Sequence, residues 1–376
     1  DPLSEDIHTE IQNQLEKKHR AAALKLHSFR SRNDQVVFDE KYYCILQGME
    51  IEQLIAKVFV SLFELSKKYR NEFFIGYTHM RRAQIIKFSN YVLSYGRMFE
   101  RDLERIEAFG RAQEICLGAG ALAGSFIKKE DYNKAIKQFI KKYGDDFPFK
   151  ISLTRNSLDN VSSRDFIIEF LSTLAILQMH LSRMAEDLIL YSTREYDFLD
   201  LPEEFCTGSS HMPHKKNPDF LELVRGYTGH VYGNLFALMT TMKGLPMTYN
   251  RDMQLDKEPL FGSVAIVKSE LSLLAKFLQG VRLNVKAVEE ALEDERLYAT
   301  ELAEYLVAKG VAFKQAHEII GKLIRYSEEH EVKLKDMVDE ILREFSPHLK
   351  QKEIKKIFSP EFAVQSKRSV DTDAKA

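Results

Sequence analysis

The densest cluster of chemically useful side chains lies in the segment GSSHMPHKKNPD at residues 208–219. It places a glycine and two serine hydroxyls shortly before a Lys-Lys-Asn group, directly ahead of a predicted helix. Cations and amide donors beside a helix N-terminus suit the binding of a carboxylate. The same residue types are typical of a solvated loop that ends at a proline, because Ser, Asn and Gly are ordinary turn residues. Composition alone therefore leaves both interpretations open.

Two other interpretations of this segment are disfavoured. Cys206, His211 and His214 are irregularly spaced, Pro213 intervenes and no fourth ligand is evident, whereas zinc sites show clean paired spacing. The glycines and lysines also do not match a phosphate-binding P-loop. We therefore expect neither a metal site nor a nucleotide-phosphate site in this segment.

Two shorter stretches are also rich in functional groups. His79 lies in GYTHMRR at residues 76–82, where Thr78 and two arginines could help to bind an anion. A histidine that merely starts a helix is the commoner case. Residues 27–35 (HSFRSRNDQ) are denser in hydrogen-bonding side chains than a solvated face, which tends towards Lys and Glu. Arg164 and Glu222, near the starts of long predicted helices, would be unremarkable alone.

The elements that must position these residues are predicted to be helices. The chain has no proline between Pro2 and Pro148 or between Pro148 and Pro202, and long helices need such stretches because an internal proline breaks a hydrogen bond. Apolar residues recur near the helical period, and no useful length alternates with period two. We therefore predict an all-α fold. Long helices are expected at residues 42–69, 84–114, 164–192, 221–243 and 263–283, shorter ones at 300–309 and 312–328, and loops at 117–124, 150–161, 205–219 and 243–259.

Composition excludes several classes of protein. The 376 residues are 44% hydrophobic and 29% charged with a net charge of −2, so no global field recruits nucleic acid or an acidic membrane. The most apolar run, residues 170–182, is too short to span a bilayer and predicts a buried core helix. Three scattered cysteines argue against a disulfide framework and favour a reducing compartment, with the cytoplasm as the default.

At this point the motifs carry a family resemblance. GSS-x-MP-x-K-x-NP at residues 208–218 resembles the signature shared by the aspartase/fumarase superfamily of helical lyases. More specific motifs cover the whole chain in order and resemble the argininosuccinate lyase family, with its δ-crystallin relatives. They are EDIH at 5–8, SRNDQ at 31–35, GYTH at 76–79, NSLD at 156–159, KKNPD at 215–219, YNRDMQ-x-DKE at 249–258 and ATELAEYLV at 299–307.

The resemblance implies the chemistry. Family members cleave argininosuccinate to arginine and fumarate by β-elimination, without a metal or organic cofactor. By motif position, Ser209 would be the base, and Lys215 and Asn217 would bind the carboxylate and its developing charge. A serine can serve as a base only if loop closure, nearby cations and helix-end amides stabilise its oxyanion. His79, polarised by Glu222, would assist the departing side or anchor a carboxylate.

The resemblance also implies the binding residues. Thr78 would lie beside His79. Arg32, Asn33 and Arg164 would hold the succinate or main-chain carboxylates, and Ser31 belongs to the same motif. Tyr249, Gln254 and Lys257 match positions that bind the arginine part of the substrate, which sister lyases lack.

The expected architecture follows by the same analogy. The fumarase/aspartase-like fold would place its long central helices in a homotetrameric 20-helix bundle, with each active site built from three subunits. We expect an N-terminal helical domain at residues 1–80, shortened relative to the family, a central long-helix domain at 81–285 and a small C-terminal helical domain at 286–376. The sequence departs from the usual family residues at Phe29, Arg81, Ile85, Ala119, His211 and His214.

Three functional hypotheses remain at this point. The first is an active argininosuccinate lyase. The second is a sister lyase acting on adenylosuccinate, fumarate or aspartate, which the segment at residues 249–258 disfavours. The third is a non-catalytic structural paralogue of the kind found in eye lenses, which the retained catalytic residues disfavour.

Overall fold

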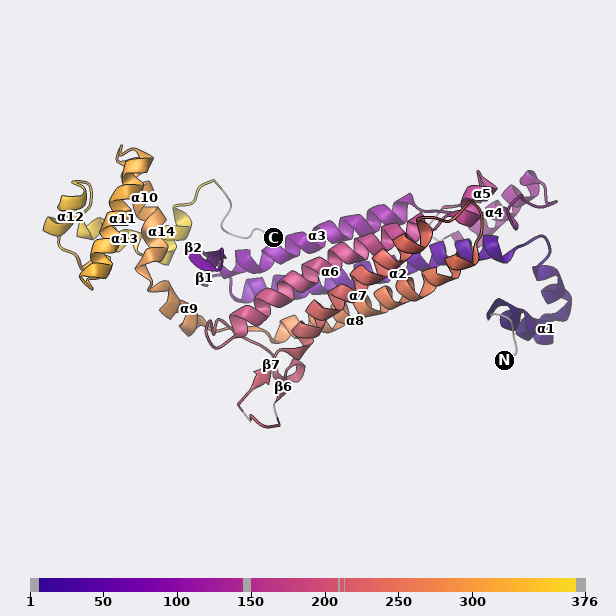
Figure 1. Cartoon of the computed structure of the whole chain (residues 1–376), viewed down its shortest axis with the longest axis horizontal. Coiled ribbons are helices and arrows are strands. Elements are labelled where there is room, and N and C mark those ends of the chain that lie inside the picture. Colours follow the sequence, from indigo (N-terminus) through magenta and orange to yellow (C-terminus); the bar gives the residue numbers. More distant parts are fainter. Residues whose placement is uncertain (1–6, 145–149, 209, 213, 370–376) are drawn as a thin grey trace. The chain divides into compact units, whose positions relative to one another are not determined.

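The computed structural model describes residues 7–144, 150–208, 210–212 and 214–369 (Figure 1). Helices dominate the described residues. Two compact units divide the chain, each assembled from three separated segments. Unit 1 comprises Asp1–Ile55, Arg101–Met179 and Gly226–Glu270, and unit 2 comprises Ala56–Glu100, His180–Arg225 and Leu271–Ala376.

Five long helices contribute residues to both units. They are α2 (Arg32–Lys68), α3 (Phe88–Ala112), α6 (Asp165–Ser192), α7 (Asp219–Met242) and α8 (Lys257–Gly280). All five correspond to predicted helices, which confirms the apolar periodicity. Two helices begin earlier in the chain than predicted: α2 begins at Arg32 instead of residue 42, and α8 begins at Lys257 instead of residue 263.

In unit 1, segments of these helices pack side by side (Figure 1). Gly48 of α2 lies against Ile106 of α3 and Phe170 of α6. Asn234 Nδ2 of α7 donates to Ser263 Oγ of α8 at 3.0 Å. The remaining elements of unit 1 are α1 (Ile7–Leu26), β3 (Glu114–Leu117), α4 (Lys129–Tyr143), β4 (Lys150–Leu153), α5 (Ser157–Ser162) and the 3-10 helix η3 (Arg251–Asp256), with β3 and β4 paired in parallel.

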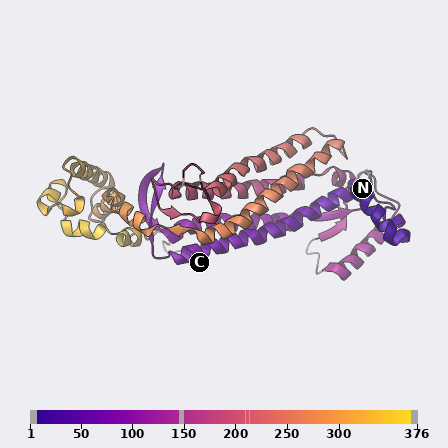
Figure 2. The same cartoon turned by 90° about the horizontal axis from the view of Figure 1, so that it is seen from below.

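In unit 2, the other segments of the same helices pack together (Figure 2). Ser61 Oγ of α2 donates to the Ala275 carbonyl of α8 at 2.8 Å. Tyr91 of α3 donates to Asp187 of α6 at 2.7 Å. Unit 2 also holds the antiparallel hairpin β1 (Phe73–Thr78) and β2 (Arg81–Lys87). Two very short antiparallel pairs join β5 (Leu199–Asp200) to β8 (Arg282–Leu283) and β6 (Thr207–Gly208) to β7 (Lys216–Asn217), and η2 (Glu203–Phe205) lies between β5 and β6 in the sequence.

The C-terminal part of unit 2 has a hydrophobic core of its own. Leu302, Leu306, Leu323 and Leu342 are among its fully buried residues. Its elements are α9 (Val285–Leu292), η4 (Glu295–Tyr298), α10 (Ala299–Ala308), α11 (Phe313–Glu329), η5 (Leu334–Asp336), α12 (Asp339–Phe345), α13 (Gln351–Ile357) and α14 (Pro360–Gln365). The helices predicted at residues 300–309 and 312–328 are confirmed as α10 and α11.

Some local predictions were wrong. The segment predicted as a helix at residues 84–114 starts inside strand β2, and its helix begins only at Phe88. The hairpin was missed because its strands are short and their burial does not alternate cleanly. The segment at residues 150–161, predicted as a loop, forms β4 and α5, and the Asn156 side chain caps α5 by accepting the N–H groups of Leu158 and Asp159. The overall prediction of a helical fold is confirmed.

The apolar run at residues 170–182 is a buried core helix, as predicted. It lies in α6, which among the described residues is the one helix long and apolar enough to cross a membrane. Phe170, Leu174, Leu177 and Leu181 are each 0% exposed. A helix whose apolar side chains are covered by neighbouring helices is explained by a protein core.

Candidate active site

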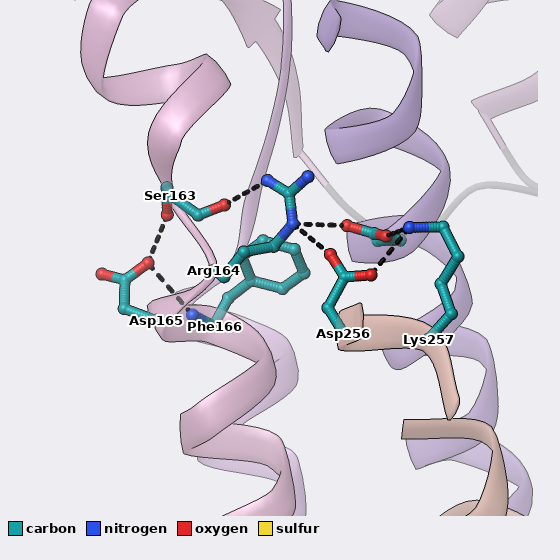
Figure 3. A network of polar contacts seen from close by, with 7 residues as sticks. Ser163, Arg164, Asp165, Phe166, Asp256 and Lys257 are labelled. Carbon is teal, nitrogen blue, oxygen red and sulfur yellow. Dashed lines mark hydrogen bonds and ion pairs between the residues drawn. The ribbon is translucent and has the colours of Figure 1, made fainter. Parts of the chain in front are cut away.

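A network of four charged side chains lies in unit 1 (Figure 3). Arg164, immediately before α6, is 2% exposed. Its Nε is 2.5 Å from Asp256 Oδ2 and 3.0 Å from Glu40 Oε2, and its Nη1 donates to the Ser163 carbonyl at 2.7 Å. Two of the three guanidinium nitrogens, Nε and Nη1, therefore donate to protein acceptors. Direct contact of Arg164 with a substrate carboxylate stays a prediction.

Lys257 is the partly exposed member of this network. It is the first residue of α8, and its side chain is 37% exposed. Its Nζ donates to Glu40 Oε1 and to Asp256 Oδ1, each at 2.7 Å. Burial lowers the pKa of Lys257, but the charge of Glu40 and the hydrogen bonds to Asp256 and Glu40 outweigh it, so that the pKa is raised overall. Lys257 is thus held as an ammonium ion at neutral pH.

The two carboxylates of the network come from different elements. Glu40 lies on α2 and is 5% exposed, while Asp256 ends η3 and is 0% exposed. Burial raises the pKa of the Glu40 carboxyl to about 7, because Asp256 adds to this effect and the charges of Arg164 and Lys257 only partly offset it. Two buried carboxylates facing two cations form a charge-balanced set, which buried ions require.

Tyr249 and Gln254 lie close to Lys257 in sequence. Tyr249 precedes η3 and is half-buried, and Gln254 lies within η3 and is exposed. Met253 and Asp256 are the buried residues of η3. The structure therefore leaves the side chains of Gln254 and Lys257, three residues apart, accessible at the η3–α8 junction.

The segment at residues 31–34 contacts the glycine-rich loop at residues 117–124. Ser31 Oγ accepts the Asn33 N–H at 3.2 Å at the start of α2. Asn33 Nδ2 donates to the Ala121 carbonyl at 3.1 Å, and Arg32 Nη2 donates to Thr9 Oγ1 at 3.2 Å. Of these three predicted residues, Asn33 contacts the loop directly, and Arg32 contacts Thr9 of α1. Their role in binding stays a prediction.

Asp34 is the residue that shapes the loop. Its buried carboxylate accepts the N–H groups of Gly118 at 3.0 Å and Gly120 at 3.2 Å, while Asn160 Nδ2 donates to it at 3.3 Å. Gly120 has a φ of 58°, and a Cβ there would lie 2.6 Å from the Gly124 carbonyl oxygen, so only glycine fits. Burial raises the pKa of Asp34, and the backbone donors act against that.

A pocket of about 630 Å³ lies between these two segments. It is open to solvent beside Ser31 and Arg32, and one rim holds the rings of Phe29 and Phe126, which meet edge to face with centroids 6.4 Å apart. Phe29 has a φ of 61°, a left-handed conformation that costs energy for a residue with a side chain. The pocket therefore brings two predicted binding residues to a cavity of ligand size.

Thr78 and His79 lie at the tip of the hairpin in unit 2. Thr78 ends β1 and pairs with Arg81 of β2. His79 and Met80 form the two-residue turn between them, with φ values of 52° and 59°. Such turns favour Asn and Gly, so a histidine here is in a strained conformation. Its catalytic role stays a prediction. The alternative that His79 starts a helix is wrong, because α3 begins at Phe88.

Residues 207–208 and 216–217 form a small ribbon in unit 2. Strands β6 and β7 pair Thr207 with Asn217 and Gly208 with Lys216. Asn217 Nδ2 lies 3.5 Å from Thr207 Oγ1, and the same hydroxyl donates to Asp219. Lys215 is exposed. Ser209, the predicted base, lies outside the described residues.

Glu222 lies in the first turn of α7 and is exposed. Its backbone N–H donates to the Pro218 carbonyl at 3.1 Å. Among the described residues, His79 and Glu222 form no hydrogen bond with each other within one chain. The predicted polarisation of His79 by Glu222 therefore stays a prediction.

Sequence reasoning missed three residues of this geometry. Asp256 lies inside a motif that was noticed, but its partner role was not foreseen. Asp34 lies in the SRNDQ motif, and its glycine-loop contacts had no sequence signal. Glu40 carried no signal at all, because it lies 217 residues from Lys257 in the chain.

Comparison with known proteins identifies the family. Residues 1–233 match the family described as Lyase, and residues 296–365 match the family described as Argininosuccinate lyase C-terminal. The argininosuccinate lyase of Caldanaerobacter subterraneus subsp. tengcongensis is 42% identical over 346 residues, which cover 92% of this chain and 76% of that protein. The chain belongs to the argininosuccinate lyase family. The family's enzyme from Geobacillus thermodenitrificans is 44% identical over 367 residues, covering 97% of this chain and 77% of the relative.

Solved structures agree on the fold. An EDDS lyase in complex with formate aligns with a TM-score of 0.83 at 22% identity, covering 95% of this chain and 71% of that chain. The class II fumarase from Schistosoma mansoni aligns with a TM-score of 0.73 at 17% identity, covering 90% and 71%. The expected fumarase/aspartase-like fold is confirmed.

Proposed function

We propose that this chain is the subunit of an enzyme that cleaves argininosuccinate into arginine and fumarate, a step of arginine biosynthesis. The observation that carries the proposal is the identity of 41% to relatives such as the argininosuccinate lyase of Syntrophotalea carbinolica, over 99% of this chain. The motif residues that the family resemblance assigns to binding and catalysis are all present in the sequence.

The reaction is a β-elimination. Ser209 removes a proton from the carbon beside a succinyl carboxylate, the carbon–nitrogen bond breaks, and the electron pair leaves on the guanidino nitrogen, which is then protonated. Negative charge builds on the carboxylate before the bond breaks. Lys215 and Asn217 supply a cation and an amide donor for that charge, and preorganised donors of this kind are the largest source of such rate enhancement.

His79 and Glu222 act on the departing side, with Thr78 beside them. The strain at His79 supports this role, since it is kept at a turn position where asparagine would be easier. The arginine part of the substrate is bound by Tyr249, Gln254 and Lys257, and the carboxylates by Ser31, Arg32 and Asn33. Arg164 acts indirectly in substrate binding, because its ion-pair partners Glu40 and Asp256 both contact Lys257.

The working enzyme is a homotetramer in the cytoplasm, with each active site combining residues of three subunits. One face of α7 supports this, because Tyr232 is 44%, Phe236 68% and Met239 41% exposed. A Cβ added to Gly226, Gly229 or Gly233 of the same helix would meet no atom of the described residues within 4 Å. An apolar helix face with small residues suits close packing against helices of other subunits. Light scattering on the purified protein should give a tetramer, and a monomer would contradict the assembly.

The function is tested by incubating purified protein with argininosuccinate and following fumarate by its ultraviolet absorbance. We expect fumarate and arginine in equal amounts, and no turnover of adenylosuccinate or aspartate at the same enzyme concentration. A folded tetramer that releases no fumarate would contradict the proposal, as would preferred turnover of adenylosuccinate.

A further inference from the structure

The network in Figure 3 is unusual because three of its four charges are buried while the fourth reaches solvent. Glu40, Arg164 and Asp256 are 5%, 2% and 0% exposed, and the Lys257 side chain is 37% exposed. Removing charges from water is costly, and a buried ionic set adds little net stability over apolar packing. The free-energy cost of burying Glu40, Arg164 and Asp256 is explained if these three residues fix the position of the Lys257 ammonium group.

We propose that Glu40 is a positioning residue for the ammonium group of Lys257, and that Arg164 holds Glu40 in the orientation that this requires. The inference rests on the proposed function, in which Lys257 binds the arginine part of argininosuccinate. It adds a residue that no sequence motif singled out. It also gives Arg164 a role that acts through Glu40.

The two oxygens of Glu40 divide their contacts between the two cations. Oε1 accepts from Lys257 Nζ at 2.7 Å, and Oε2 lies 3.0 Å from Arg164 Nε. Arg164 is fixed in turn by Asp256 and by the Ser163 carbonyl. A planar guanidinium held by hydrogen bonds at Nε and Nη1 cannot rotate freely. Glu40 Oε2, which accepts no hydrogen bond among the described residues, therefore faces a positive charge in a fixed position.

These contacts fix the directions in which the Lys257 ammonium group can donate hydrogen bonds. A lysine ammonium has three N–H donors and a flexible four-carbon stem. Glu40 and Asp256 use two of those donors, each at 2.7 Å. Fixing two of the three N–H directions fixes the third, which remains for an acceptor on the exposed side. That acceptor has the chemistry of the α-carboxylate of the substrate's arginine part.

A second lysine–glutamate pair in unit 1 serves as the matched control. Lys268 of α8 donates to Gln47 at 2.8 Å and to Glu50, both on α2. The Glu50 side chain is 53% exposed, so the pair joins the same two helices but is largely solvated. Exposed pairs of this kind contribute little. Glu50→Gln makes the same chemical change as Glu40→Gln without touching Lys257.

The experiment measures kcat and KM for argininosuccinate in the full-length enzyme and four variants: Glu40→Gln, Lys257→Met, the double variant and Glu50→Gln. We expect Glu40→Gln to raise KM about tenfold with kcat within about twofold, because a misdirected ammonium weakens binding and leaves the reacting groups in place. In the double variant KM should equal that of Lys257→Met, because Glu40 acts through Lys257. Glu50→Gln should match the parent enzyme.

Two results would overturn the inference. One is a KM for Glu40→Gln equal to that of Glu50→Gln, and the other is a double variant whose KM increase is the product of the two single increases. A merely structural Glu40 would give the second result, since general loosening does not depend on Lys257.

A labelling measurement separates this inference from the proposed function. Lys257 is acetylated with acetic anhydride at fixed pH and quantified by peptide mass spectrometry. Glu40 raises the pKa of Lys257, so Glu40→Gln should increase the acetylation rate of Lys257 and leave that of Lys268 unchanged. An unchanged Lys257 rate would contradict the inference even if the enzyme is active, whereas absent fumarate with an increased rate would contradict the function alone.

Discussion

Arg164 and Lys257, two predicted binding residues of unit 1, lie in surroundings opposite to those of His79 and Lys215, two predicted catalytic residues of unit 2. Arg164 is 2% exposed and ion-paired to two buried carboxylates, and Lys257 is tied to the same pair. His79 lies exposed at a hairpin tip and Lys215 is exposed in a short ribbon. Substitutions in the first group should therefore affect binding and stability together, whereas those in the second should affect turnover with little change in stability.

The largest expected effect tests this contrast directly. Arg164→Met leaves Glu40 and Asp256 without their buried cation, and breaking a buried ion pair costs about 3–5 kcal/mol of unfolding free energy. Lys215→Met is the matched substitution in unit 2, and it should change the unfolding free energy by less than about 0.5 kcal/mol while turnover falls. Urea denaturation and fumarate release measure the two quantities. Equal losses of unfolding free energy in both variants would contradict the difference in surroundings between Arg164 and Lys215.

The contrast also explains which parts of the protein could be predicted from the sequence. The five long helices were predictable because each repeats apolar residues at the helical period, as α6 does with Leu174, Leu177 and Leu181. The hairpin at His79 was not, because its two-residue turn contains His and Met where Asn and Gly would signal a turn.

The residues of the candidate site were also only partly predictable from the sequence. Lys257 and Arg164 were singled out by family motifs, but Glu40 of α2 depends on contacts with Arg164, just before α6, and with Lys257, the first residue of α8, that no local pattern encodes. Asp34 resembles it, because its partners Gly118 and Gly120 come from a loop far along the chain.

Unit 1 also holds a buried carboxyl that, among the described residues, pairs with no cation, in contrast to Glu40 and Asp256. Glu270 of α8 is 6% exposed and accepts a hydrogen bond from Gln178 Nε2, and among the described residues it has no ion pair. Burial raises the pKa of Glu270 from 4.5 to about 8. A raised pKa means that the folded state keeps the proton, so its stabilisation is complete below pH 4.5 and is lost as the pH rises towards 8.

Glu270→Gln removes this titration while keeping the shape of the side chain. The stability of the variant relative to the parent should increase between pH 5 and pH 8 by on the order of 2 kcal/mol. Urea denaturation at both pH values checks the result, with Glu50→Gln as the control on an exposed carboxyl of the same unit. A difference independent of pH would show that Glu270 is ionised in the folded protein.

The smallest effect concerns the strained turn of unit 2. Met80 has a φ of 59° and is 62% exposed, so glycine there removes left-handed strain at little loss of contact. Met80→Gly should stabilise the protein by about 1 kcal/mol, and Met80→Ala, which keeps the strain, should not. Thermal denaturation compares the two variants. If the glycine variant is no more stable than the alanine variant, the left-handed conformation of Met80 does not destabilise the hairpin.

The central claim is that unit 1 residues bind the substrate while Ser209 performs the chemistry. Calorimetric titration of argininosuccinate into Ser209→Ala protein tests it most directly, because this variant should bind without turnover. We expect a dissociation constant within about threefold of the parent KM, and binding at least about tenfold weaker when Lys257→Met is added. Weak binding to Ser209→Ala, or no further loss on adding Lys257→Met, would contradict it.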